Sequence, residues 1–337
     1  MLALLLATVT VRLLPLPPHA TIDPFGPRSL MAAAPDGTIA ASVTIRGFIK
    51  RIVMWRTTGG YVLPDLRGAT FVAGFDSNGA LLANGEQPVR EFGSATSPID
   101  LRSCENFPQS SAGPLIAGAL VDGSLIATMQ SPPMVDLDDA SGQYAPVVLH
   151  LRSGQCLNMG NGVALGTGGL YTAGYTAYIA NVPAPSNVIS ERERFVAMRW
   201  HERTREPLGE GVAVAVAANG TAAGSDAPPG SGAAFNRAPH ALLWYAGSST
   251  AVELAAQSPS SVAYAVDDRN RVAGMVEDES RRHFAFLWQN GVLRRLDDLV
   301  RVPGWRFESA YAFGTGDAIV GIGTYRGTAA AFEVTGL

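Results

Sequence analysis

The sequence is short of charge, and of lysine above all. Only 16% of its 337 residues are charged, Lys50 is the one lysine among 25 basic residues, and the net charge at pH 7 is −4. Because a nucleic-acid-binding protein needs a basic face, this balance argues against a nucleic-acid partner. The apolar run at the N-terminus, residues 2–7, is too short to cross a bilayer. We therefore expect no membrane span.

Catalytic signatures are missing as well. The five histidines form no His-Glu-x-x-His metal helix, and no Gly-x-Ser-x-Gly nucleophile elbow occurs. Lys50 does not follow a glycine-rich stretch, which excludes a phosphate loop, and residues 160–166 are one residue too long for a dinucleotide loop. We assign no catalytic residue, no metal ligand and no cofactor.

One acidic segment, residues 136–142, is a candidate for Ca²⁺. Its spacing departs from the EF-hand pattern, so a solvated loop is the favoured interpretation. A second polar group consists of Asp36, Asn78, Asp122 and Asn219, which all precede a turn glycine. Turn chemistry explains them, since Asp and Asn stabilise hairpins, and a cation or polar ligand between them is the alternative.

What the sequence does contain is a repeated unit. Its turn residues recur at intervals of 42 to 51 residues, at Gly37, Gly79, Gly123, Gly169, Gly220, Asn270 and Gly316. Each turn precedes a short strand of small apolar residues. The third strand ends in a large side chain, namely Trp55, Trp200, Trp244, Trp288 and Phe332, with His150 at the matching place in the third unit. In the second unit the third strand is either Val89–Phe92 or residues 98–102.

The residue choices fit a ring of small sheets. Positive φ is easy for Gly and tolerable for Asn, which suits tight hairpins. Small residues let sheets converge near an axis, and a Trp on an outer strand fills the wider space between them. Four short strands repeated seven times predict an all-β, seven-bladed β-propeller of four-stranded antiparallel blades with almost no helix, in one domain over residues 8–337.

The N-terminus suggests how the ring closes. Residues 1–7 look like the remnant of a signal peptide. Residues 8–14 alternate with period two, and the last unit lacks a fourth strand of its own, so we expect this segment to pair with residues 329–334. Residues 20–23 are the alternative closing strand.

The repeats resemble the bacterial extracellular HAF-repeat family. The resemblance lies in residues 240–244 (His-Ala-Leu-Leu-Trp) and 284–288 (Phe-Ala-Phe-Leu-Trp), and in the Val-Ala-Gly strand at 272–274. It is strong from about residue 208 onward and faint before about residue 160. The resemblance implies a propeller-like fold and a secreted, extracellular or periplasmic protein, and it carries no catalytic residues.

Cys104 and Cys156 are the only cysteines. In an exported chain such a pair favours a disulfide. Outer strands of adjacent blades splay apart, however, and the bond needs Cα atoms within about 7 Å of each other. Both outcomes stay open.

Insertions indicate a binding surface. From turn residue to third-strand ring the chain takes 27, 31 and 24 residues in the third to fifth units, against 18, 18 and 16 in the first, sixth and seventh. The loops near 129–145, 176–194 and 226–239 should lie side by side, and their polar and aromatic groups suit recognition. The candidate binding residues are Asp136, Asp138, Tyr144, Tyr178, Asn187, Arg192, Phe235 and Arg237.

Two function classes remain. The favoured one is an exported, non-catalytic β-propeller that acts as a binding scaffold for a protein or glycan partner at a surface, in a matrix or on a polysaccharide. The alternative is a propeller enzyme, a lyase or hydrolase of polysaccharide. Such an enzyme needs acidic, Arg, His or Tyr groups converging on the axis. The insertions of the third to fifth units have an alternative interpretation of their own, as loops that a protein surface tolerates without any function.

Overall fold

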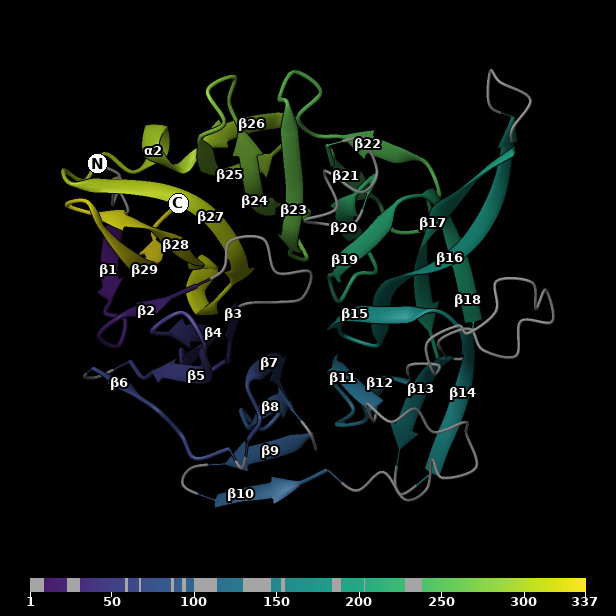
Figure 1. Ribbon diagram of the computed structural model, residues 1–337, viewed down its shortest axis with the longest axis horizontal. Helices are drawn as coiled ribbons and strands as arrows, with labels where there is room; N and C mark the ends of the chain where they lie inside the picture. Colours follow the sequence, from purple (N-terminus) through teal and green to yellow (C-terminus); the bar gives the residue numbers. More distant parts are fainter. Residues whose placement is uncertain are drawn as a thin grey trace, which may run out of the picture.

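Seven small antiparallel sheets stand around one axis in the computed structural model (Figure 1). The structure describes residues 9–22, 31–57, 60–66, 68–85, 88–92, 95–99, 114–129, 147–152, 155–183, 189–202, 204–227 and 238–337. The protein is a seven-bladed β-propeller of four-stranded blades, as the repeat predicted.

Within a blade the strands follow one another outward from the axis in chain order. The first blade has an inner edge in two pieces, β2 (Ala20–Thr21) and β3 (Met31–Ala33), followed by β4 (Ile39–Ile45), β5 (Ile49–Trp55) and β6 (Tyr61–Val62). The second has β7 (Phe71–Phe75), β8 (Leu81–Asn84), β9 (Val89–Phe92) and β10 (Ala95–Pro98). The third has β11 (Pro114–Ala119), β12 (Leu125–Met129), β13 (Val147–Arg152) and β14 (Gln155–Asn161).

The remaining four blades keep the same order, except that the outermost strand of the seventh, β1, comes from the N-terminal part of the chain. The fourth has β15 (Val163–Gly168), β16 (Tyr171–Pro183), β17 (Ile189–His201) and β18 (Thr204–Glu210). The fifth has β19 (Val212–Val216), β20 (Ala222–Ser225), β21 (Ala241–Trp244) and β22 (Ala251–Glu253). The sixth has β23 (Ser260–Val266), β24 (Val272–Glu277), β25 (His283–Gln289) and β26 (Val292–Arg295). The seventh has β27 (Trp305–Phe313), β28 (Ile319–Tyr325), β29 (Thr328–Thr335) and β1 (Thr10–Leu14).

Helix is nearly absent from the described residues. They contain the one-turn helix α2 (Leu296–Leu299) and the 3₁₀ turn η2 (Thr315–Asp317). None of the helices in this part of the chain is long and apolar enough to cross a membrane.

The turn between first and second strands works as predicted. All seven predicted turn residues have positive φ, from 57° at Gly169 to 88° at Gly220, and Asn270 adopts 61°. The first blade shows the hydrogen bonds of such a turn: the Gly37 N–H donates to the Ala34 carbonyl at 3.0 Å, and the Ala34 N–H to the Thr38 carbonyl at 2.8 Å.

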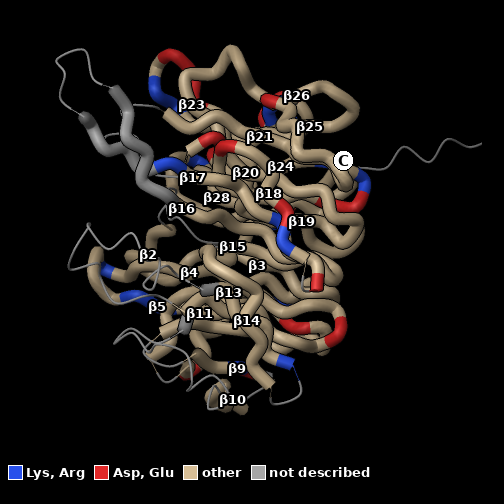
Figure 2. Tube along the Cα trace, turned by 90° about the vertical axis from the view of Figure 1, so that its right-hand side faces the viewer, with Lys and Arg blue, Asp and Glu red and all other residues tan. Residues whose placement is uncertain are grey.

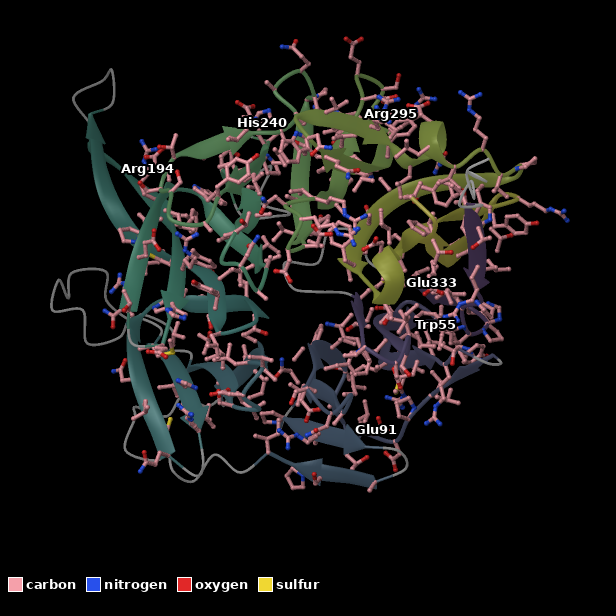
Figure 3. All side chains as sticks on the ribbon, turned by 180° about the vertical axis from the view of Figure 1, so that it is seen from behind. Trp55, Glu91, Arg194, His240, Arg295 and Glu333 are labelled. Carbon is pink, nitrogen blue, oxygen red and sulfur yellow. The ribbon has the colours of Figure 1, made fainter. Side chains whose placement is uncertain are left out.

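Ring closure by the N-terminal strand is confirmed. β1 pairs antiparallel with β29, from Thr10 opposite Thr335 to Leu14 opposite Ala331. The Arg12 and Glu333 side chains, opposite each other in this register, form an ion pair at 2.9 Å. The Trp55 indole N–H of the first blade donates to the Pro15 carbonyl at 2.8 Å, so the same segment also holds the neighbouring blade (Figure 3).

The alternative closing strand has another role. Ala20 and Thr21 pair with Ile45 and Thr44 of β4, so β2 extends the inner edge of the first blade. In the second blade Val89–Phe92 is the third strand, which decides between the two segments considered, and β10 is the fourth.

The register corrects the assignment of the large side chains. Trp55, Trp200, Trp244 and Trp288 lie opposite equivalent residues of the second strands. The equivalent places hold Glu91, Leu151 and Val334 in the second, third and seventh blades. His150 and Phe332 are therefore wrongly matched to the tryptophans, because one and two residues of register separate them from that place.

Side chains tie the early blades together. Ser42, Asn84 and Thr128 stand at the fourth position of the second strand in the first three blades. Each accepts a hydrogen bond from a backbone N–H of the next blade's innermost strand, at 2.8 to 2.9 Å. Buried polar groups need such partners, and here the pairing also fixes how adjacent sheets stack.

Candidate functional site

Apolar side chains of several innermost strands form one buried cluster. The innermost strands of the fourth to seventh blades contribute Leu165, Val214, Tyr264 and Tyr311 to one apolar cluster that also includes Met31 of the first blade. The rings of Tyr264 and Tyr311 lie 4.8 Å apart. Of these innermost residues only the two tyrosines are titratable, and both are buried. Paired carboxylates of the kind that glycoside hydrolysis uses are not among them.

Turn chemistry accounts for the polar residues at one mouth of the ring. Asp36, Asp122 and Asn219 each accept a hydrogen bond from the backbone N–H two residues later, at 2.8 to 3.0 Å. In the second blade Asp76 plays this part and accepts from the Asn78 and Ala80 N–H groups. No group of three or more His, Cys, Asp or Glu side chains suited to a metal occurs among the described residues.

Charged turns of the fifth to seventh blades bind one another on this face. Arg271, 2% exposed, pairs with Asp267 at 2.7 Å and with Asp317 at 3.0 Å. Asn219 donates from its backbone N–H to Asp268 at 2.9 Å and from its amide to Asn270 at 3.1 Å. These polar groups bind one another, so the network links the fifth, sixth and seventh blades.

A Ser–His–Asp group in the third blade is arranged for structure. Ser124 Oγ donates to Asp122 Oδ1 at 2.5 Å, and His150 Nε2 lies 2.7 Å from the same hydroxyl oxygen. Since the hydroxyl proton goes to Asp122, His150 donates to Ser124 and does not activate it. The Ser124 hydroxyl lowers the pKa of Asp122, and burial lowers the pKa of His150. Ser124 and His150 are also 5% and 7% exposed, which hides them from a substrate.

Two of the predicted binding residues, Tyr178 and Arg192, belong to the part of the chain that the structure describes. Asp136, Asp138, Tyr144, Asn187, Phe235 and Arg237 lie outside the described residues, as do Cys104 and residues 1–8. Tyr178 lies on β16 opposite Arg194, and Arg192 lies on β17 opposite Ala180, so the two predicted residues stand two pairs apart in register. Cys156 lies on β14 and packs against the core between the second and third blades.

The β16–β17 hairpin is the insertion that the structure describes best. Its backbone pairs run from Tyr171 opposite His201 to Pro183 opposite Ile189. The hairpin extends beyond the outer edge of the ring (Figure 1).

A hollow of about 660 Å³ opens between the fifth and sixth blades. Its walls are the link between those blades, residues 254–259, and the connection between β24 and β25, residues 278–282. Blade links and second-to-third-strand connections share one face of the ring, which we call the loop face. Leu254, Val276 and Leu293 form an apolar floor that belongs to the core between the two blades.

Charged side chains of both signs surround this floor. The lining includes Glu277, Asp278, Glu279, Arg282 and Arg295. Asp278 accepts from the Arg282 guanidinium at 2.7 and 2.9 Å, and this hydrogen bonding lowers the pKa of the Asp278 carboxyl. The sequence offered a signal that we did not use, since residues 277–282 (Glu-Asp-Glu-Ser-Arg-Arg) carry five charges in six positions.

The Phe284 ring contacts both arginines of the hollow, Arg282 and Arg295. The guanidinium carbon of Arg295 lies 4.0 Å from the centre of the Phe284 ring, and that of Arg282 lies 5.6 Å from it. Cation–π contacts of this kind hold a guanidinium in place while leaving its N–H groups available. Arg295 has no carboxylate partner within the described residues.

Comparisons with known proteins establish the fold. No protein-family model and no curated protein matches the sequence. Among solved structures, the chain is similar to the β-propeller domain of the trilobed protease from Pyrococcus furiosus, at 9% identity, with 90% of this chain and 93% of that chain covered and a TM-score of 0.58. That domain is described as having an open velcro topology, whereas β1 closes the ring here.

Two further structures are more distant. A gluconolactonase from Xanthomonas campestris is 10% identical over 91% of this chain and 86% of its own, with a TM-score of 0.42. The lectin of Aleuria aurantia, solved with α-methyl-L-fucoside, is 11% identical over 79% of this chain and 92% of its own, with a TM-score of 0.39.

Proposed function

We propose that this protein is an exported, non-catalytic β-propeller that binds an extracellular partner on its loop face. The hollow between the fifth and sixth blades carries this proposal, because its volume and its apolar floor with a few polar groups are typical of binding sites. Export, and kinship with the HAF-repeat proteins, rest on the N-terminal apolar segment and the repeat motifs.

The partner surface extends beyond the hollow. The insertions predicted from the sequence near 129–145, 176–194 and 226–239 belong to the third, fourth and fifth repeats, and the fifth blade forms one side of the hollow. We therefore propose that the partner surface extends from the hollow toward these blades.

Binding is favoured over hydrolysis by the state of the carboxylates. A general acid needs a raised pKa so that it holds a proton near neutral pH. The pKa of Asp278 is lowered instead, by the Arg282 guanidinium. Glu277 is held by Arg281 at 2.9 Å, so this carboxylate also serves an ion pair.

Filling the hollow tests the proposal. Ala256→Trp places a large ring in its wall and should abolish retention on the immobilised extracellular matrix of the producing culture. Leu170→Ser, at an exposed position on the opposite face, should leave retention unchanged. Equal retention of the two variants would contradict docking at the hollow, and release of reducing ends from the matrix would contradict a non-catalytic role.

A further inference from the structure

The floor of the hollow is rigid and apolar. Leu254 and Val276 are 8% and 4% exposed and belong to the packed core that joins the fifth and sixth blades. Leu293 of β26 packs on the same core. A ligand that rests on this floor must present an apolar face, since burying a polar group there without a partner costs free energy.

The walls are close to neutral in charge. The lining holds the three consecutive carboxylates of Glu277, Asp278 and Glu279 and the two guanidiniums of Arg282 and Arg295. Arg281 lies outside the lining, and its ion pair with Glu277 offsets the one negative charge in excess. The carboxylates would repel a strongly anionic ligand, and the guanidiniums would repel a cationic one. The site is therefore suited to an uncharged ligand.

Donors and acceptors alternate around the floor. Carboxylates only accept hydrogen bonds and guanidiniums only donate them, whereas a hydroxyl group does both. The Gln257 amide and the Ser280 hydroxyl of the walls can each donate and accept. A ligand with several hydroxyl groups satisfies such mixed walls better than one with a single polar group.

The polar groups are already held in position. Asp278 accepts from the backbone N–H groups of Ser280 at 2.8 Å and Arg282 at 3.0 Å, which shapes the connection between β24 and β25. Arg295 is stacked on Phe284 and has N–H groups to spare. Side chains fixed before binding lose less conformational entropy when a ligand arrives.

We infer that the hollow between blades five and six binds an uncharged carbohydrate, whose C–H face rests on Leu254, Val276 and Leu293 while its hydroxyls bond to Arg295, Gln257 and the carboxylates. This inference rests on the proposed function and names the class of ligand for the same site. Arg295 is the central donor, because it is the guanidinium in the walls that no described carboxylate occupies.

Affinity electrophoresis tests the inference with defined probes. Gels containing dextran, galactomannan or laminarin supply neutral polysaccharides, and alginate supplies a polyuronate. Retardation by at least one neutral polysaccharide is expected. Arg295→Ala and Gln257→Ala should each weaken it at least tenfold, and Arg294→Ala, a change at the next residue of β26 outside the hollow, should leave it unchanged.

Three outcomes would overturn the inference. They are no retardation by any neutral polysaccharide, retardation by alginate alone, and equal retardation of the Arg294 and Arg295 variants. Gln257 is exposed in a link, so its variant keeps the test valid if Arg295→Ala unfolds the protein. If Ala256→Trp abolishes matrix retention while the neutral gels retard nothing, the proposed function stands and the ligand class falls. If Ala256→Trp changes nothing, both fall.

Discussion

At the scale of single residues, glycine determines how closely the two inner strands of a blade approach. Gly174, Gly224, Gly274 and Gly321 occupy one register position in the fourth to seventh blades. A Cβ on Gly274 would collide with the carbonyl oxygen of Val262, and one on Gly224 with that of Val212. A bulge in the first strand follows this position in all four blades, and the close approach of the two strands explains why a glycine recurs here in the second strand.

The second blade has a carboxylate where four other blades have tryptophan. Glu91 is 6% exposed, and burial raises the pKa of its carboxyl against the opposing effect of Arg56. A raised carboxyl pKa in the folded state means that ionisation at higher pH favours unfolding. The stabilisation by the protonated Glu91 carboxyl is fully present below its unfolded-state pKa near 4.5. It is lost as the pH rises through the higher folded-state pKa.

Glu91→Gln should therefore raise the Tm at pH 7, because it removes a charge that the fold buries at a cost. The gain over the wild type should shrink as pH falls toward 4, where Glu91 is protonated in both states. Thermal melts at pH 7 and pH 4 measure it. A variant that is less stable than the wild type at pH 7 would show that Arg56 outweighs burial.

At the scale of elements, β1 decides how the ring is closed. Strand β29 would otherwise leave an edge of unpaired backbone groups at the seventh blade. Within β1, Leu14 is 2% exposed and packs in the apolar cluster shared with the first blade, while its neighbour Leu13 is 45% exposed.

Leu14→Ala should destabilise the protein by about 2–5 kcal/mol, as expected for a truncated core leucine. Leu13→Ala is the matched control and should change stability by less than about 0.5 kcal/mol. Urea titration measures both.

Deleting residues 1–18 should lower the Tm clearly, and an unchanged melting curve would mean that β1 is not needed for closure.

At the scale of the whole molecule, charged residues lie both in turns and on strands. Many of the acidic and basic residues stand in turns at the edges of the ring in Figure 2, and strands such as β9 and β26 carry others. Turns and links bring such charges together at the surface, as in the hollow between blades five and six.

A disulfide between Cys104 and Cys156 would clamp the second and third repeats together in an exported chain. Closing a loop of about 50 residues stabilises a protein by about 4 kcal/mol in the chain-entropy model. We expect the native protein to show no reactive thiol and its Tm to fall on reduction, with the Cys104→Ser, Cys156→Ser double variant melting like the reduced protein. Two thiols that titrate in the native protein would contradict the pairing.

The sequence by itself determined the architecture. Turn residues that tolerate positive φ, small strands and outer tryptophans follow from local backbone and packing rules, so the blade number, the antiparallel blades and the closing strand could be predicted from it. It failed where one residue of register decides the outcome, as for His150, since residue type alone does not set the register between paired strands. The two pieces of the inner edge of the first blade were also missed, because strands of two and three residues are too short to show a pattern and form only by pairing with β4.

Tertiary structure alone decided which polar residues are free. The sequence shows Asp36, Asp122 and Arg271 as chemically capable groups, but only the folded ring shows that turns and neighbouring blades occupy them. The hollow was invisible for a related reason. Leu254, Glu277 and Arg295 are far apart in the sequence and belong to two blades, and packing those blades side by side is what creates a recess with an apolar floor and charged walls.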